Sequence, residues 1–255
     1  MEHNKKKTRG NERFPSTGDE ERKLLCKNLS FTALEQYKLI RANLDFTFPE
    51  DDECPVIGIT SSVRGEGKST TAINLAYVFA EKKDNVLLID GDLRLPSIAK
   101  KLDIESYPGL TDLLKGKGAQ LSEFQSPLIS NLFVLPSGDL PPNPSELLGS
   151  SRMENILSKL RGMFNYIIID LPPVNIVSDA ISISKLVSGM IVVIREEYTE
   201  KKALERCFQQ LKLSKVNILG CVINDARFGN GFYGKYKKHS RNYKYYRNSM
   251  KGSGQ

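Results

Sequence analysis

The chain has 255 residues, of which 40% are apolar, and its formal net charge is +7. This length and apolar content are sufficient for one α/β domain with a hydrophobic core. The four cysteines lack CxxC spacing, so we expect reduced thiols in a cytosolic protein and neither a disulfide framework nor a zinc site; they are Cys26, Cys54, Cys207 and Cys221.

Membrane-targeting signals are absent from the sequence. No apolar run approaches the ~20 residues needed to cross a bilayer. The Lys/Arg-rich start, residues 1–13, lacks the apolar segment of a signal peptide. We therefore expect a cytoplasmic protein that contacts a membrane only electrostatically or through another protein.

Strand and helix patterns alternate along the chain, after a polar segment that we predict to be a flexible N-terminal arm, residues 1–30. Apolar residues recur at helical spacing over 32–46, 68–82, 145–160 and 200–213, and Ser145 is the expected N-cap of the third helix. Short apolar runs predict buried strands at 56–60, 86–89, 132–135, 166–169, 190–194 and 216–223. This alternation predicts an α/β fold for residues 31–225, a doubly wound, mostly parallel sheet with helices on both faces.

A phosphate-binding loop follows the first predicted strand. Residues 62–69, Ser-Val-Arg-Gly-Glu-Gly-Lys-Ser, match the P-loop pattern except that Ser62 replaces the first glycine. Gly65 and Gly67 allow the backbone to curl so that its N–H groups point at one anion. Lys68 is expected to reach the β- and γ-phosphates, and the Ser69 hydroxyl to bind Mg²⁺. The strand before the loop and the helix after it favour a nucleotide site over a Gly-rich turn that binds nothing.

Carboxylates end two further strands. Asp90 and Asp92 follow the second predicted strand, and Asp170 ends the fourth. In doubly wound sheets ligands bind beyond the carboxyl ends of the strands, so these acids should lie beside the P-loop. An aspartate in this position usually holds Mg²⁺, directly or through water. Two acids exceed what one ion needs, and the spare carboxylate could accept the proton of a substrate hydroxyl.

These motifs together resemble those of the bacterial tyrosine kinases of capsule and exopolysaccharide synthesis. The resemblance rests on the P-loop with Thr70 after it, on Asp90-Gly91-Asp92-Leu93-Arg94, and on Ile169-Asp170-Leu171-Pro172-Pro173. These segments correspond to the Walker A, A′ and B motifs of that family. Residues 141–148, Pro-Pro-Asn-Pro-Ser-Glu-Leu-Leu, and residues 35–41 also resemble family segments.

The resemblance implies a deviant-Walker P-loop kinase domain at 31–225 that uses ATP and Mg²⁺. It makes Lys68, Asp90, Asp92 and Asp170 the catalytic residues and Ser69, Asp90 and Asp170 the metal ligands, without deciding which of Asp90 and Asp92 is the base. The nucleotide-binding residues would be Gly65, Glu66, Gly67, Lys68, Ser69, Thr70 and Asn224, the last of which resembles an adenine contact in related ATPases. Arg94 is either a surface charge or a phosphate contact.

The resemblance also implies partners. Glu35, Lys38 and Arg41 match an E-x-x-R/K-x-x-R motif with which family members form rings, although a solvated helix face would also explain them. A separate membrane-spanning chain would activate the kinase and hold it at the inner face of the cell membrane, as in the two-chain form of the family. A cognate tyrosine phosphatase is expected too.

A basic tail ends the chain. Residues 226–255 hold eight Lys/Arg and no acid, so the tail is +8 and residues 1–225 carry −1 in total. The tail also holds five of the ten tyrosines, and without apolar periodicity we predict it to be disordered; they are Tyr233, Tyr236, Tyr243, Tyr245 and Tyr246. Such a segment could bind single-stranded nucleic acid or an anionic membrane, but beside a kinase-like P-loop we favour phosphoacceptors, with no nucleic acid partner.

The leading prediction is therefore an ATP-dependent tyrosine autokinase that phosphorylates its own tail in trans and regulates polysaccharide synthesis and export. The alternative is a MinD- or ParA-like positioning ATPase without kinase activity. Those ATPases carry a second lysine in the P-loop, and Val63 occupies the equivalent position here, followed by Arg64. A third reading is a regulatory module whose ATP site only controls assembly.

Overall fold

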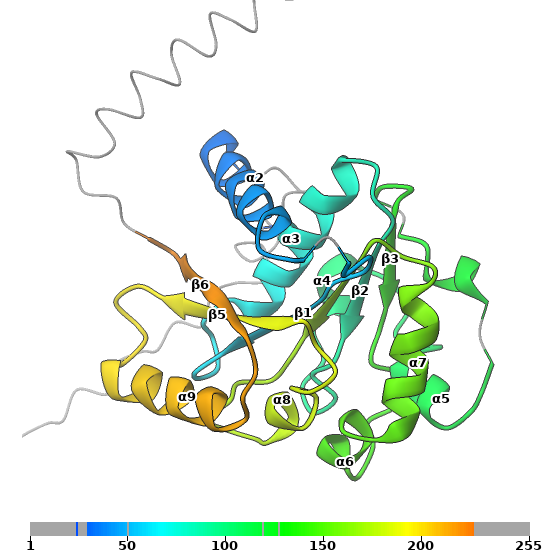
Figure 1. The fold of residues 1–255 in the computed structure, drawn as a ribbon. Coiled ribbons are helices and arrows are strands. Elements are labelled where there is room, and N and C mark those ends of the chain that lie inside the picture. The colour runs from blue at the N-terminus through cyan, green and yellow to red at the C-terminus, as the bar shows by residue number, and fades with distance from the viewer. Residues whose placement is uncertain (1–23, 25–29, 50, 119, 127, 227–255) are drawn as a thin grey trace, which may run out of the picture.

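The computed structural model describes residues 24, 30–49, 51–118, 120–126 and 128–226 (Figure 1). They form a six-stranded sheet in the order β3-β2-β4-β1-β5-β6, in which every strand pair is parallel. The strands are β1 (Val56–Ser61), β2 (Val86–Asp90), β3 (Leu132–Leu135), β4 (Tyr166–Asp170), β5 (Gly189–Arg195) and β6 (Ile218–Asn224). The predicted doubly wound α/β fold is confirmed.

Helices cover both faces of the sheet (Figure 1). One apolar cluster joins a face of the sheet to three of the described helices, α2 (Phe31–Asp45), α3 (Lys68–Glu81) and α4 (Ile98–Leu102). The second cluster joins the other face to five further helices of the described residues, which are α5 (Leu110–Leu114), α6 (Pro144–Leu148), α7 (Ser151–Arg161), α8 (Asp179–Ser182) and α9 (Lys201–Leu213). A 3-10 turn, η2 (Leu121–Phe124), precedes β3.

Alternate residues of each central strand enter opposite clusters, which explains the continuous apolar runs in the sequence. In β2, Leu87 and Ile89 belong to one cluster and Val86 and Leu88 to the other, all at most 1% exposed. A strand that is apolar on both faces belongs in a parallel sheet with helices on each side.

The predicted helix over 145–160 is wrong as one element, because the structure contains two helices there. Helix α6 ends at Leu148, and α7 begins after Ser150, whose side chain accepts a hydrogen bond from the Met153 amide and so caps α7. Ser145 is therefore not an N-cap; it lies inside α6, after Pro144 at the helix start. Gly149 separates the helices, and a glycine beside a Ser cap favours such a break.

The other predicted elements are present with small shifts at their ends, and β6 begins at Ile218 rather than 216. No helix among the described residues is long and apolar enough to span a bilayer. Within the predicted N-terminal arm the structure describes only Leu24, which is buried in the cluster beneath α2 and α3, and Ser30, which caps α2.

Candidate functional site

The P-loop links β1 to α3, and its backbone requires glycine. Gly65 and Gly67 have φ angles of 81° and 96°, in the region that side chains disfavour. A Cβ atom on Gly67 would lie only 2.0 Å from Nδ2 of Asn224. Helix α3 begins directly at Lys68, so its free N–H groups and positive end face the space in front of the loop.

Glu66 holds the loop closed from the inside. Its carboxylate accepts hydrogen bonds from the Ser62 hydroxyl and the Val63 amide, both at 2.8 Å, and from the Thr199 hydroxyl. Glu66 is 0% exposed, so its side chain faces the protein interior. Ser62, the departure from the P-loop pattern, thus supplies a hydroxyl that a glycine could not. Glu66 was predicted as a nucleotide contact, and in the structure its side chain fixes the shape of the loop.

Lys68 joins the P-loop to the two acidic strand ends. Its Nζ lies 2.8 Å from Oδ2 of Asp92 and 3.3 Å from Oδ1 of Asp170. Burial by itself would lower the pKa of Lys68, but the charges of Asp170 and Asp92 outweigh it and raise that pKa. The lysine is thus held charged at the place where phosphates would bind.

Asp90 holds the loop after β2 rather than facing the cavity. Its Oδ1 accepts the Asp92 amide at 3.3 Å, and its Oδ2 accepts the amides of Ser97 and Ile98, each at 3.0 Å. Burial, together with the charge of Asp170, raises the pKa of Asp90 to about 7. The three predicted acids therefore gather beside the P-loop, but Asp92 is the one of the A′ pair that lines open space.

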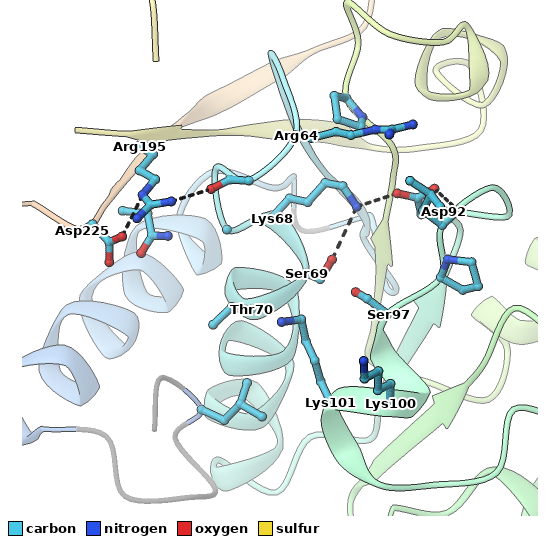
Figure 2. A pocket seen from close by; sticks show the side chains of 17 residues that line it. Arg64, Lys68, Ser69, Thr70, Asp92, Ser97, Lys100, Lys101, Arg195 and Asp225 are labelled. Carbon is cyan, nitrogen blue, oxygen red and sulfur yellow. Dashed lines mark hydrogen bonds and ion pairs between the residues drawn. The ribbon is translucent and has the colours of Figure 1, made fainter. Parts of the chain in front are cut away.

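A cavity of about 490 Å³ opens in front of the loop (Figure 2). Figure 2 shows Lys68 crossing it toward Asp92, with Ser69 below and the basic side chains of Arg64, Lys100 and Lys101 around it. All of the predicted nucleotide contacts except Glu66 line this cavity, namely Gly65, Gly67, Lys68, Ser69, Thr70 and Asn224. Such a concave, cationic site beside a helix N-terminus is suited to a nucleotide.

The end of β5 and the loop after it also fasten the P-loop, a role that the sequence analysis did not predict. Arg195 donates to the Gly65 carbonyl at 3.2 Å and pairs with Asp225 at 2.9 Å, as Figure 2 shows. The Tyr198 hydroxyl donates to the Arg64 carbonyl at 3.0 Å. From the end of β6, Asn224 donates to the Glu66 carbonyl at 3.0 Å. The three contacts to the P-loop join residues at least 130 positions apart, so no local sequence pattern predicts them.

The side chains beside Lys68 fit a magnesium ion. The Ser69 hydroxyl is hydrogen bonded to the Asp170 carboxylate, so two oxygens of the kind that Mg²⁺ prefers already lie together. Among the described residues no three His, Cys, Asp or Glu side chains form a metal cluster. Mg²⁺ usually takes one or two carboxylates and fills its shell with water and phosphate oxygens.

The residues predicted to form the oligomer contact lie on α2 and do not line this cavity. In α2, Lys38 pairs with Glu35 at 3.0 Å, whereas Arg41 donates to the Val78 carbonyl of α3 at 2.6 Å. Arg41 thus has an intramolecular role in fastening α2 to α3. The phosphoacceptor candidates, Tyr233 to Tyr246, lie outside the described residues.

The fold and the site together define a P-loop nucleotide-binding protein of the deviant-Walker type. The family model described as "AAA domain" matches residues 54–218, which is consistent with this class. In fold the chain is similar to the septum site-determining protein MinD of Pyrococcus horikoshii, solved with Mg-ADP. The TM-score is 0.56 at 25% identity, over 67% of this chain and 70% of that one.

Comparison with curated proteins narrows the class. The chain is 38% identical over 204 residues to the tyrosine-protein kinase YwqD of Bacillus subtilis, covering 78% of this chain and 86% of the relative. It is 37% identical to the tyrosine-protein kinase CpsD of Streptococcus pneumoniae serotype 4, with coverages of 82% and 92%. The crystal structure of the chimerical protein CapA2B2 superposes with a TM-score of 0.71 at 34% identity, over 76% and 85% of the two chains. The chain therefore belongs to the bacterial protein-tyrosine kinase family, as its motifs predicted.

Proposed function

We propose that this kinase transfers the γ-phosphoryl group of ATP to tyrosines of its own C-terminal tail, from one subunit to another. The observation that carries the proposal is the position of Lys68, held between Asp92 and Asp170 at the mouth of a phosphate-binding loop. A bound nucleotide would draw Lys68 toward its phosphates and so release Asp92, which lines the cavity, to face an incoming hydroxyl.

Each residue then has a defined role. The P-loop amides and Lys68 bind the β- and γ-phosphates, and Ser69 and Asp170 hold Mg²⁺, with Asp90 fixing the loop beside them. Bound Mg²⁺ supplies charge neutralisation on the phosphates. As the tyrosine Oη–phosphorus bond forms, the bond from phosphorus to the β–γ bridging oxygen breaks, and ADP leaves. Asp92 is placed to accept the tyrosine proton, since a phenol with a pKa near 10 benefits from an adjacent base.

The tail supplies acceptors and a charge switch. Its +8 charge would be attracted to acidic surfaces and to bound phosphates. Each phosphate adds about −1.5 to −2, so five would bring the tail near neutrality. Phosphorylation would thereby release the tail from an anionic surface. If the fully phosphorylated chain binds anionic vesicles as strongly as the bare chain at equal salt, this switch does not operate.

The wider setting of the enzyme forms part of the proposal. We infer a homo-oligomer, with Glu35 and Lys38 on the outer side of α2 available to a neighbour, and a ring as its form. We also propose, from membership of this family, that the kinase acts at the inner face of the cell membrane, bound to a membrane-spanning activator of polysaccharide synthesis and export. A tyrosine phosphatase would reset the tail.

The test is phosphotyrosine mapping by mass spectrometry after incubation with Mg-ATP, beside Lys68→Met. The cytoplasmic segment of a co-encoded membrane protein is added to both samples. We expect phosphate on the five tail tyrosines of the wild-type chain and none in the variant. Hydrolysis of ATP without phosphotyrosine would favour the positioning-ATPase alternative. If the chain neither hydrolyses ATP nor gains phosphotyrosine, the remaining interpretation is a module that uses ATP only for assembly.

A further inference from the structure

Helix α6 (Pro144–Leu148) belongs to a segment that resembles the kinase family, but its residues do not line the nucleotide cavity. The structure gives its Ser145 a specific partner. The Ser145 hydroxyl lies 2.5 Å from Oδ1 of Asp179, at the start of α8, and 3.0 Å from the Ser178 hydroxyl. Asp179 is 0% exposed, so a charged side chain is buried against a short helix that contains no other acid or base.

The buried charge of Asp179 is paired with Arg94 of the A′ motif. Nε of Arg94 lies 3.0 Å from Oδ2 of Asp179, and Nη2 lies 3.0 Å from Oδ1, so the contact is a two-pronged ion pair. Nη2 also lies 3.3 Å from the Ser145 hydroxyl. In this structure Arg94 is therefore held in an ion pair, and it does not line the nucleotide cavity. A bidentate arginine–carboxylate pair fixes orientation as well as distance.

The pair completes the fastening of the loop that carries Asp92. At its inner end this loop is held by Asp90, which accepts the Ser97 and Ile98 amides. Within the loop, Oδ1 of Asp92 accepts the Leu95 amide at 3.0 Å, which leaves Oδ2 for Lys68 at 2.8 Å. Arg94 lies between Asp92 and Leu95 in the chain, so its side chain anchors the turn that orients the Asp92 carboxylate.

We propose that Asp179 and Ser145 are positioning residues for phosphoryl transfer, which hold Arg94 and through it aim Asp92 at the acceptor hydroxyl. This inference rests on the proposed function, because it gives Asp92 a substrate to face. Neither Asp179 nor Ser145 lines the nucleotide cavity, and within the described part of the chain their side chains bond to Arg94, Ser178 and each other rather than to the P-loop. Loss of the pair should therefore lower kcat and leave nucleotide binding intact.

A second cluster of the same three residue types provides a matched control. Asp52 accepts a hydrogen bond from the Ser188 hydroxyl at 2.7 Å and pairs with Arg161 at 3.2 Å. This cluster precedes β1 and β5, at the opposite edge of the sheet from the nucleotide cavity. Substituting its aspartate removes a comparable ion pair and Ser contact without touching the A′ loop.

The experiment compares Asp179→Asn, Ser145→Ala, Arg94→Lys and Asp52→Asn in the full-length chain. Measured quantities are kcat and KM for ATP in tail phosphorylation, Kd for a fluorescent ADP analogue, and Tm. A carboxylate moved by about 1 Å can cost about 100-fold in rate, so Asp179→Asn should lower kcat by about 10- to 100-fold. Its Kd and KM should stay within about threefold of wild type, because the interaction lost acts only in the transition state.

Further variants separate positioning from general destabilisation. Arg94→Lys keeps the charge but loses the two-pronged contact, and should resemble Asp179→Asn. The double variant should be little worse than either single one, because both remove the same contact. Should Asp179→Asn fold poorly, Ser145→Ala tests the same contact with no charge change, and its kcat should also fall.

Three outcomes contradict the inference. The first is a kcat of Asp179→Asn and Ser145→Ala equal to wild type. The second is a loss of kcat that also occurs in Asp52→Asn, with the fall in kcat of each variant following the fall in its Tm. In both cases wild-type tail phosphorylation persists, so the proposed function stands and only the positioning role is lost. In the third, the wild-type chain phosphorylates no tyrosine, and the inference fails together with the proposed function.

Discussion

Asp90 and Asp170 occupy the same register position on neighbouring parallel strands, so that the last residues of β2 and β4 lie side by side. Both side chains are 0% exposed. Two carboxylates in such a place cannot both be ionised cheaply without a cation, and burial raises the pKa of Asp90 as well as that of Asp170. The charge of Lys68 partly offsets this effect at both positions.

The first prediction concerns stability and pH. The pKa of Asp90 is about 7 in the folded protein and near 3.8 when unperturbed. The folded chain therefore keeps a proton that the unfolded chain has released between these values. The contribution of the Asp90 carboxyl to the free energy of unfolding is therefore fully present below about pH 4 and is lost as pH rises through about 7.

Asp90→Asn should consequently reduce the fall in unfolding free energy between about pH 5 and about pH 7.5 in the nucleotide-free protein. Urea denaturation at both pH values measures this change. Asp139→Asn, which alters an exposed carboxylate, is the control and should keep the wild-type pH dependence. An Asp90→Asn variant with the wild-type pH dependence would show that the carboxyl is already ionised at low pH.

The second prediction concerns the inner support of the P-loop. Glu66→Ala removes the acceptor for the Ser62 hydroxyl, the Val63 amide and the Thr199 hydroxyl. Leaving these groups without a partner should lower the unfolding free energy by about 1–3 kcal/mol and weaken ADP binding. Guanidinium denaturation and nucleotide titration measure the two effects. Glu81→Ala, at an exposed site near the end of α3, should change stability by less than about 0.5 kcal/mol.

The third prediction concerns the backbone at Gly67. Its φ of 96° disfavours any side chain, and a Cβ added at Gly67 would lie 2.0 Å from Nδ2 of Asn224. Gly67→Ala should therefore abolish detectable nucleotide binding in a calorimetric titration while the far-ultraviolet dichroism stays that of a folded protein. At Gly162 a Cβ would meet its nearest heavy atom at 3.6 Å, so Gly162→Ala should bind nucleotide normally. Wild-type affinity in Gly67→Ala would mean that the loop opens more freely than its contacts indicate.

The sequence was sufficient for the fold because its signals are local. Apolar runs such as 86–89 and 166–169 became buried strands, and the Gly-rich loop between a strand and a helix became the P-loop. The acids that ended two of those runs came together because parallel strands end at one edge of the sheet. The single long helix over 145–160 failed because Gly149 and the capping side chain of Ser150 outweigh the apolar periodicity around them.

The contacts that shape the site could not be predicted in this way. Arg94 and Asp179 are 85 residues apart, and Glu66 and Thr199 are 133 apart. Nothing near Asp179 in the sequence distinguishes it from a solvated helix N-terminus. Glu66 looked like a nucleotide contact because it lies inside the P-loop motif, and only the tertiary structure shows that its side chain turns inward.

The most direct test of tail phosphorylation in trans mixes two full-length chains that are each unable to label themselves. The acceptor is Lys68→Met with an intact tail, and the donor has an intact site with its five tail tyrosines changed to Phe. With Mg-ATP and the cytoplasmic segment of the membrane partner, we expect phosphate on the tail of the Lys68→Met chain at Tyr233, Tyr236, Tyr243, Tyr245 and Tyr246. ATP hydrolysis by the donor with no phosphotyrosine on the acceptor would contradict this result and leave the P-loop with a function other than tyrosine phosphorylation of the tail.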